Sequence, residues 1–198
     1  LLSSVLQKVK IPVIAAGGFR DGSGLAAALA WGAEGIAMGT RFMMTDESPV
    51  PSQTKESYIS AGIDDIKITK KFDGLPHRLI FNDYIKKIDH SNPFTLLLIS
   101  IRSAIKYKQL TQSSYKDLFR AFFAMLKGDD LTISQSVMSA NSPAIIQKAM
   151  VEGFPNEGAM PSGQVAGIIT NLPACEELVS EIMRDFDKAC EKLEVIRR

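Results

Sequence analysis

The sequence predicts an α/β fold, because two short apolar segments that end in glycine stand one helix apart. Residues 13–18 are an apolar run closed by two glycines, and residues 35–40 are a second run closed by Gly-Thr. Residues 25–32, between them, are rich in Ala and Leu and also end in glycine. The order strand, helix, strand is typical of two neighbouring parallel strands.

The glycines at the strand ends indicate a site for an anion. Parallel strands one βα unit apart end at the same edge of their sheet, so the loops from Gly17 and Gly39 can direct backbone N–H groups at one ligand. In (β/α)8 barrels, the loops after strands 7 and 8 bind phosphate in this place. We therefore expect the phosphate of a flavin or of a phosphosugar here.

The chain opens with helical spacing of Leu and Val over residues 1–9, and its character changes after residue 47. From there on, apolar residues recur mostly at helical intervals, with Ser, Asn or Pro at expected helix starts and Gly at several expected ends. The expected helices cover residues 48–62, 92–109, 113–128, 142–153 and 173–195, and the first of them begins either at Ser48-Pro49 or at Ser52. Alternation over residues 66–69 predicts a short strand, residues 72–76 read as a turn, and residues 78–88 fit either a strand or a helix.

The composition is that of an ordinary globular protein and excludes several functional classes. A formal net charge of +1, from 23 basic and 22 acidic residues, does not provide the basic surface that nucleic acids require. Cys175 and Cys190 form no CxxC pair, so we expect no metal site, no disulfide framework and a reducing, cytoplasmic setting. The most apolar stretch, residues 94–101, is far shorter than the roughly 20 residues that span a bilayer, so we expect no membrane partner.

The two predicted parallel strands require further strands around them. A parallel sheet is covered by helices on both faces, and an eight-stranded barrel takes about 250 residues. The chain has 198 residues, does not begin with Met and contains only two convincing parallel strands. We therefore expect a fragment of a longer protein.

Two motifs resemble the nitronate monooxygenases, formerly called 2-nitropropane dioxygenases. The longer motif begins with Ile-Pro-Val-Ile-Ala-Ala-Gly-Gly-Phe-Arg-Asp-Gly-Ser-Gly at residues 11–24 and continues to Gly-Ile-Ala-Met-Gly-Thr-Arg-Phe at residues 35–42. The shorter one, Pro-Ser-Gly-Gln-Val-Ala-Gly-Ile-Ile at residues 161–169, is similar to the Gly-Gln-x-Ala-Gly element that follows the helical insertion of this family. Residues 63–155 match only loosely, through Phe-Asp-Gly-Leu-Pro-His-Arg.

The resemblance implies the C-terminal part of an FMN-binding (β/α)8 TIM barrel with an appended, mainly helical segment. Residues 1–62 would contain barrel strands 7 and 8 with the site for the FMN phosphate. Residues 63–170 would be a mainly helical insertion on the substrate side, and residues 171–198 a terminal helix that packs back on the barrel. The helical residues 92–153 would either shield the active site or form the interface of a homodimer.

The resemblance also implies a cofactor and a reaction. FMN would oxidise an alkyl nitronate, or a similar small molecule, with O₂ as the second substrate. By motif position, six residues would bind the cofactor: Gly17, Gly18, Ala37, Met38, Gly39 and Thr40. Glycine lets the backbone approach a phosphate, Thr40 adds a hydroxyl donor, and the helix that starts near Gly22 contributes a favourable dipole.

The catalytic histidine of this family usually lies in a Gly-Gly-His element, which this sequence does not contain. We therefore assign no catalytic residue and expect that histidine in a preceding part of the protein. The histidines present, His77 and His90, are better explained by hydrogen bonds in a turn or at the surface.

Four further residues have simple roles or alternative ones. Asp21 is expected to cap the helix that follows it, and Glu47 to be the acidic charge at a helix start. Arg41 would neutralise the phosphate or form a structural salt bridge. Gln164 would contact the flavin or the substrate, or simply belong to a turn.

Two other functions are compatible with the same motifs. A flavin-dependent enoyl-acyl-carrier-protein reductase shares the barrel ending and the Gly-Gln-x-Ala-Gly element, but it reduces a double bond with a nicotinamide cofactor. A fragment that is inactive, or that only binds a phosphate ligand, needs no more than the two glycine-ended loops. Bound FMN in the full-length protein separates the flavoenzymes from this last alternative.

Overall fold

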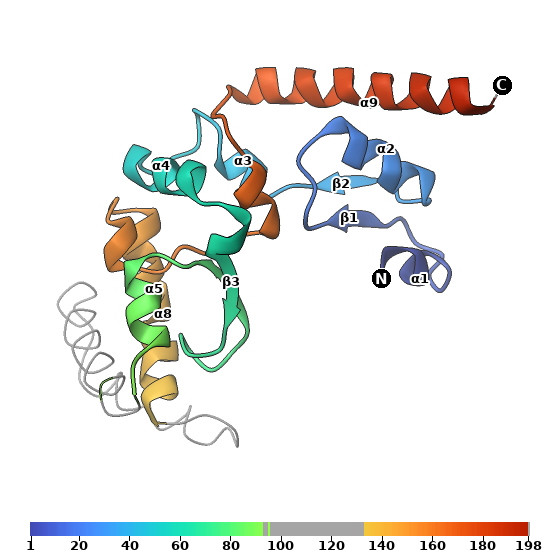
Figure 1. Cartoon of the computed structure of the whole chain (residues 1–198). Coiled ribbons are helices and arrows are strands. Elements are labelled where there is room, and N and C mark those ends of the chain that lie inside the picture. Colours follow the sequence, from blue (N-terminus) through green and yellow to red (C-terminus); the bar gives the residue numbers. More distant parts are fainter. Residues whose placement is uncertain (93–94, 96–132, 198) are drawn as a thin grey trace. The chain divides into compact units, whose positions relative to one another are not determined.

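The computed structural model describes residues 1–92, 95 and 133–197, which form two compact units. Unit 1 consists of Leu1–Pro49 and Gly163–Arg198, and unit 2 of Val50–Ser162 (Figure 1). The helices expected over residues 92–109 and 113–128 lie almost entirely outside the described residues. At the start of the first, the side chain of Asn92 accepts a hydrogen bond from the Thr95 backbone N–H at 2.8 Å, as an N-cap does.

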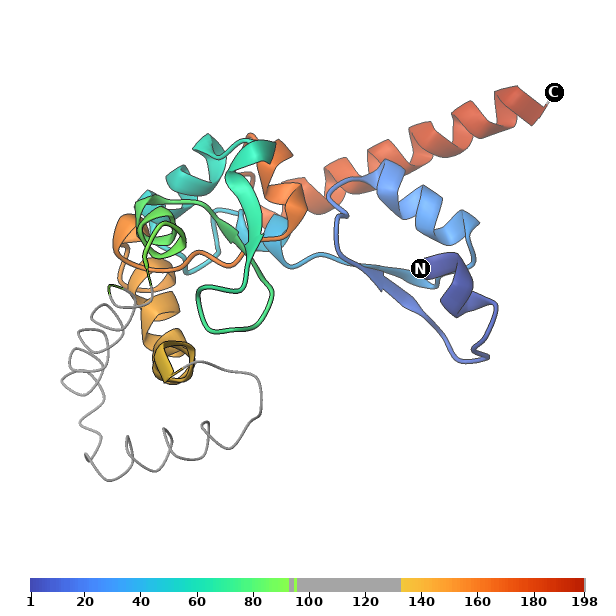
Figure 2. The same cartoon turned by 60° about the horizontal axis from the view of Figure 1, so that its bottom comes forward.

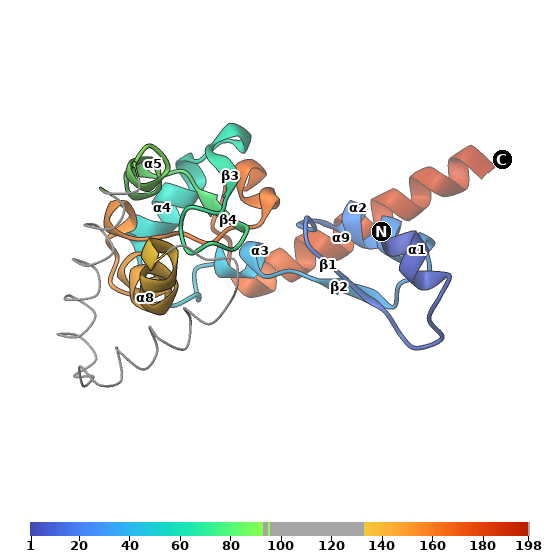
Figure 3. The same ribbon diagram turned by 90° about the horizontal axis from the view of Figure 1, so that it is seen from below.

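Unit 1 contains the predicted pair of parallel strands. Strand β1 (Ile14–Ala16) pairs with strand β2 (Gly35–Ala37), with Ile14 opposite Gly35 and Ala16 opposite Ala37 (Figure 3). The predicted helix between them is α2 (Gly22–Ala30), and a short helix α1 (Leu2–Leu6) precedes them. Their small core consists of three buried alanines, Ala15, Ala28 and Ala33. Leu2, Phe19 and Ile36 pack against it.

The C-terminal helix α9 (Cys175–Arg197) packs along α2, and the two helices run side by side in Figures 1 and 2. Gly22, the first residue of α2, makes this packing close. A Cβ built on Gly22 would lie 2.0 Å from the Ile182 carbonyl oxygen and 2.2 Å from the Phe186 backbone nitrogen. Only a residue without a side chain therefore fits where the two helices meet.

The starts of α2 and α9, the two longest helices of unit 1, each have an acidic side chain that accepts a backbone N–H. Asp21 is confirmed as the cap of α2, since its carboxylate accepts the Gly24 backbone N–H at 3.0 Å. Glu47 also lies at a helix start, but at that of α9: its two carboxylate oxygens lie 2.9 and 3.0 Å from the Cys175 backbone nitrogen. The helix served by Glu47 is therefore far away in sequence, because the chain returns to this point after residue 170.

Unit 2 joins a β-hairpin to helices. Strand β3 (Ile66–Thr69), as predicted, pairs antiparallel with β4 (His77–Ile80). The helices and 3-10 turns around them are α4 (Ser52–Ser60), η1 (Ile63–Asp65), α5 (Asp83–Asp89), α8 (Ile133–Met150) and η2 (Pro155–Glu157). The core that they share contains Phe72, Leu79, Ile85, Ile88, Ile145 and Ala159.

Residues 160–162 are held along β4. The Ile80 N–H donates to the Met160 carbonyl at 3.0 Å, and the Ser162 N–H donates to the Arg78 carbonyl at 3.1 Å. The buried Tyr58 hydroxyl donates to the Pro161 carbonyl at 2.5 Å, and burial raises the pKa of this phenol. The beginning of the shorter motif is thus part of the hydrogen-bonded structure of unit 2.

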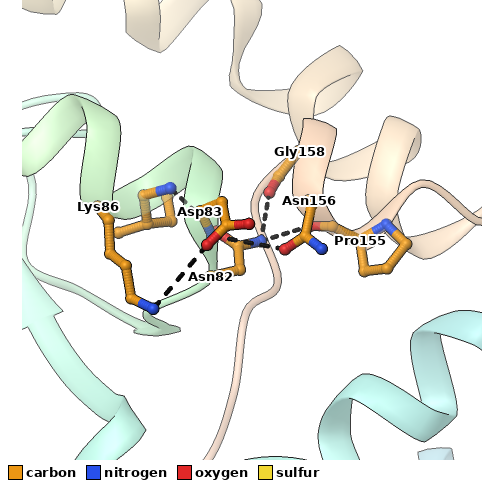
Figure 4. Close-up of polar contacts among 7 residues, drawn as sticks. Asn82, Asp83, Lys86, Pro155, Asn156 and Gly158 are labelled. Carbon is orange, nitrogen blue, oxygen red and sulfur yellow. Dashed lines mark hydrogen bonds and ion pairs between the residues drawn. The ribbon is translucent and has the colours of Figure 1, made fainter.

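Asn82 is a buried polar centre of unit 2 (Figure 4). Its Oδ1 accepts the Ile85 backbone N–H at 2.9 Å, which caps α5. Its Nδ2 donates to the carbonyls of Gly158, at 2.8 Å, and of Pro155. One amide side chain therefore closes a helix start and holds the segment after α8 against it.

One expected helix start differs from the structure, and two expectations that were left open are decided by it. Helix α8 does not begin at residue 142 but runs through Pro143. Asn141 and Ile145, on either side of this proline, are both buried, so the packing of unit 2 favours a continuous helix over one that starts at Pro143. The ambiguous residues 78–88 contain both alternatives, the strand β4 and the helix α5. Of the two expected starts of α4, the structure has the one at Ser52, with Pro51 in the cap position and no side-chain cap.

The two units divide the chain at other points than the expected boundaries after residues 62 and 170. Helix α4 belongs to unit 2, where the Thr54 hydroxyl donates to the Ala149 carbonyl at 2.6 Å. Residues 163–170 belong to unit 1, where the Gly163 N–H donates to the Thr40 hydroxyl oxygen. Long-range hydrogen bonds of this kind are not visible in the sequence pattern.

Among the described residues, no helix has the length and apolar character needed to cross a membrane.

Substitution of Gly22 by Ala in the full-length protein should lower the free energy of unfolding by about 2 kcal/mol or more, because the methyl group overlaps backbone atoms of α9. Helix propensity alone would favour Ala by up to about 1 kcal/mol, so the sign of the change decides between the two effects. Urea unfolding measures it. Gly62→Ala is the matched control, because its Cβ would meet only Asp65 Oδ2, at 3.6 Å. A stabilised Gly22→Ala protein would contradict the close packing.

Substitution of Asn82 by Asp should destabilise the protein by about 3 kcal/mol, and by more than Asn82→Ala does. The aspartate keeps the cap of α5, but it places a carboxylate oxygen against the carbonyls of Pro155 and Gly158. Asn156→Ala is the control in the same cluster, since Asn156 accepts only a long, exposed bond of 3.4 Å from the Asp83 N–H. Thermal unfolding of the three variants tests the order, and Asn82→Asp equal to wild type would refute it.

Candidate functional site

The first part of the candidate site is the loop that follows β1. Gly17 and Gly18 have φ angles of +95° and +83°, a backbone conformation that side chains strain. Both glycines are exposed, and a Cβ built on either one would meet nothing within 4 Å. Glycine at these positions is therefore required by the turn, and the space beside it is open to a ligand.

The second part is the loop that follows β2. Since Ala16 pairs with Ala37, the residues after these two lie at the same edge of the sheet. Gly39 precedes helix α3 (Thr40–Met43), and a Cβ built on it would also meet nothing within 4 Å. The two predicted loops are thus neighbours with open space at three glycines. This is an arrangement in which backbone groups can approach a phosphate closely.

The structure joins the shorter motif to this second loop. The Gly163 backbone N–H donates to Thr40 Oγ1 at 3.0 Å, and the 3-10 turn η3 (Gln164–Ile168) contacts α3. Gln164 is the first residue of η3 and is exposed. Within the described part of the chain its side chain forms no hydrogen bond, so both of its expected roles stay predictions. Gly163 was expected only as part of a motif, and its bond to Thr40 is visible only in the structure.

Arg41 follows Thr40 in the sequence, but its hydrogen bonds are those of a structural residue. Its guanidinium is buried and donates to the Asn171 carbonyl at 3.2 Å and to Asn171 Oδ1 at 2.8 Å. Burial lowers the pKa of this guanidinium, and the carboxylate of Glu181 opposes that shift. Of the two expected roles, the structural one agrees better with these contacts. The partner, however, is an amide, since no carboxylate in the described residues lies within ion-pair distance of Arg41.

The start of α2 is less available to an anion than its dipole suggests. The carboxylate of Asp21 already accepts the Gly24 N–H there, and Arg20 Nε lies 3.2 Å from Asp21 Oδ2. Arg20 also donates to the Ile168 carbonyl at 2.7 Å. The local charges therefore neutralise one another, and the loops after β1 and β2 remain the better place for a phosphate.

His77 lies in unit 2 and takes part in a turn, as expected. Its Nε2 atom lies 2.8 Å from Oδ2 of the buried Asp73, and its ring meets Phe72 edge-on at 5.8 Å between centroids. The other carboxylate oxygen of Asp73 accepts the Leu75 backbone N–H at 3.0 Å. His90 is the C-cap residue of α5. The sequence analysis did not single out Asp73 as the centre of this turn. An Asp side chain that accepts the backbone N–H two residues further on, as in an Asx-turn, is a known turn signal that could have identified it.

Chemically, the site offers two kinds of group to a phosphate. Gly17, Gly18 and Gly39 leave room for the ligand to reach the backbone. A threonine hydroxyl has one proton and two lone pairs, and the Gly163 N–H uses a lone pair of Thr40, so the proton stays available to a ligand. These residues fit a phosphate, and a proton acceptor for catalysis is not among them.

Comparison with known proteins gives one consistent family. The family described as nitronate monooxygenase matches residues 1–185. A (3aS,4S,5R,7aS)-5-hydroxy-7a-methyl-1-oxo-octahydro-1H-indene-4-carboxyl-CoA dehydrogenase of Rhodococcus jostii is 43% identical over 197 residues, which are 100% of this chain and 56% of that protein. A probable nitronate monooxygenase of Staphylococcus saprophyticus is 38% identical over 89 residues, which are 45% of this chain and 25% of that protein.

A solved structure agrees with these relatives. FabK from Thermotoga maritima is similar with a TM-score of 0.67 and 28% identity over 99% of this chain and 50% of that one. The chain spans about half the length of the two curated relatives that match 93% or more of it. The two parallel strands with their helix agree with the barrel that this family and its structural neighbours share. The chain therefore belongs to the nitronate monooxygenase family, whose members are flavin-dependent oxidoreductases with a TIM-barrel fold.

Proposed function

We propose that the full-length protein is an FMN-dependent oxidoreductase and that this chain holds the phosphate of FMN between the loops after β1 and β2. The observation that carries the proposal is the parallel register of Ala16 with Ala37, because it brings the two glycine-ended loops to one edge of the sheet. The residues proposed to bind the cofactor are Gly17, Gly18, Ala37, Met38, Gly39 and Thr40. FMN supplies the electron acceptor when it is bound.

The described residues provide binding and orientation. The open space at the three glycines lets phosphate oxygens reach the backbone without meeting a Cβ. Thr40 donates its hydroxyl proton to one of these oxygens, and charge-assisted bonds of this kind are stronger than neutral ones. A phosphate held by these groups would anchor the cofactor to this chain.

For the substrate, a CoA thioester is the candidate with the broader support. The dehydrogenase from Rhodococcus jostii, which acts on a carboxyl-CoA compound, matches this chain over its whole length, including the residues of unit 2. The nitronate monooxygenase relative from Staphylococcus saprophyticus matches less than half of it. We therefore infer that the full-length protein dehydrogenates a CoA thioester. Oxidation of alkyl nitronates with O₂ is the second candidate, and the family match over residues 1–185 supports it.

Substitution of Gly18 by Ala should weaken FMN binding at least tenfold, because the methyl group intrudes on the phosphate and strains a φ angle of +83°. Gly32→Ala is the matched control, since Gly32 has a φ angle of +102° and equally open surroundings but lies at the end of α2. Both variants should lose about 1 kcal/mol of stability from strain. Titration of the full-length apoprotein with FMN measures the dissociation constants. Equal FMN affinities of the two variants would contradict the proposed site.

Anaerobic reduction of the flavin tests the substrate. The full-length protein is mixed with the hydroxyindanone carboxyl-CoA compound that the relative's name specifies, or with propyl-2-nitronate, and bleaching of the flavin absorbance is followed. Faster bleaching by the CoA thioester is the expected result. Faster bleaching by the nitronate would overturn this choice in favour of the second candidate. Bleaching by NADH together with turnover of an enoyl thioester would overturn both in favour of an enoyl reductase, and a protein that binds no flavin would refute the enzyme proposal itself.

A further inference from the structure

Gly163 lies close to the Thr40 side chain, and this contact, not its backbone conformation, favours glycine at position 163. Its φ and ψ angles are −77° and 155°, which any residue can adopt. A Cβ built on Gly163 would nevertheless lie 3.0 Å from Thr40 Oγ1 and 3.7 Å from Thr40 Cβ. A side chain at position 163 would therefore be crowded by the hydroxyl of Thr40 and not by the backbone conformation.

The hydrogen bond between the two residues uses the oxygen of the Thr40 hydroxyl as an acceptor and leaves its proton for a further hydrogen bond. The Gly163 N–H donates to Thr40 Oγ1 at 3.0 Å, so it occupies a lone pair of the hydroxyl and fixes the position of the oxygen. A hydroxyl proton rotates freely unless something orients it, and it turns away from a donor that approaches the same oxygen. Within the described residues, no protein acceptor takes this proton. It is thus directed away from Gly163 and can be donated to a ligand.

We propose that Gly163 is a positioning residue of the phosphate site: its N–H orients the Thr40 hydroxyl so that Thr40 donates to the FMN phosphate. This inference rests on the proposed function, because it assumes that FMN is the ligand. It gives the Gly-Gln element of the shorter motif a specific role, although residue 163 is 123 positions away from Thr40 in the sequence. Gly163 itself contributes through Thr40 and needs no contact with the cofactor.

A purely structural role predicts something different. If the bond only tethers η3 to α3, its loss would lower the stability and weaken every flavin equally. If the bond orients the hydroxyl, its loss would weaken FMN but spare riboflavin, which has the same ring and no phosphate. The ratio of the riboflavin to the FMN dissociation constant, here called the phosphate selectivity, separates the two roles.

The experiment uses the full-length protein with four variants and one control. Gly163→Ala crowds the hydroxyl, Thr40→Val removes it at nearly constant shape, Thr40→Ser keeps it, and the fourth variant combines Gly163→Ala with Thr40→Val. Gly62→Ala is the control, since its added Cβ would meet only Asp65 Oδ2, at 3.6 Å. Fluorescence titrations with FMN and with riboflavin give the phosphate selectivity, and circular dichroism shows which variants are folded.

Gly163→Ala, Thr40→Val and their combination should each lower the phosphate selectivity by about tenfold, or about 1.4 kcal/mol. The combination should be no worse than Thr40→Val alone, because Gly163 acts through the hydroxyl. Thr40→Ser and Gly62→Ala should keep the wild-type selectivity. Wild-type selectivity in Gly163→Ala, or a loss in the combination equal to the product of the single losses, would overturn the inference.

Two further outcomes keep the test decisive. If Gly163→Ala does not fold, the two Thr40 variants decide, and wild-type selectivity in Thr40→Val would refute the proposed donation. If the wild-type protein binds neither flavin, the proposed function fails together with this inference. A wild-type protein that prefers FMN over riboflavin, with a Gly163→Ala variant that keeps this preference, refutes the inference alone.

Discussion

The parallel pairing of β1 with β2 is the constraint on which the candidate site depends. The ends of two strands joined by a helix lie side by side at one edge when the strands are parallel and neighbours, and the register of Ala16 with Ala37 meets both conditions. Helix α2 keeps this register because it buries Ala28 against Ala15 and Ala33. A shift of one residue in the pairing would move one loop along the strand direction relative to the other and separate the groups proposed to bind a phosphate.

Four glycines of unit 1 stand where they do for two different physical reasons. A Cβ on Gly22 or Gly163 would meet neighbouring protein atoms, at 2.0 and 3.0 Å, so these positions are small because something lies against them. A Cβ on Gly17 or Gly18 would meet nothing within 4 Å. Glycine is required at these two positions by their positive φ angles, and a ligand can occupy the open space beside them.

Unit 2 depends on polar groups that link segments distant in sequence. Asn82 joins the start of α5 to the residues after α8, and Tyr58 holds Pro161. Such buried polar groups stabilise a structure only when they find their partners, so they favour one arrangement of the chain over its alternatives. The same long-range packing explains why α8 continues through Pro143, a residue that more often begins a helix than interrupts one.

The sequence by itself determined the features that depend on neighbouring residues. The apolar runs, the glycines after them and the cap at Asp21 identified both parallel strands and the helix between them, and the length of the first motif identified the family. These features could be predicted because strand propensity, capping and positive φ angles are local properties of the chain.

Only the tertiary structure decided what depends on contacts between distant residues. It assigned Glu47 to the start of α9, Arg41 to Asn171 and the Gly163 N–H to Thr40. No pattern of neighbouring residues encodes such partners, because each of them is chosen by the way in which segments more than a hundred residues apart fold back on one another.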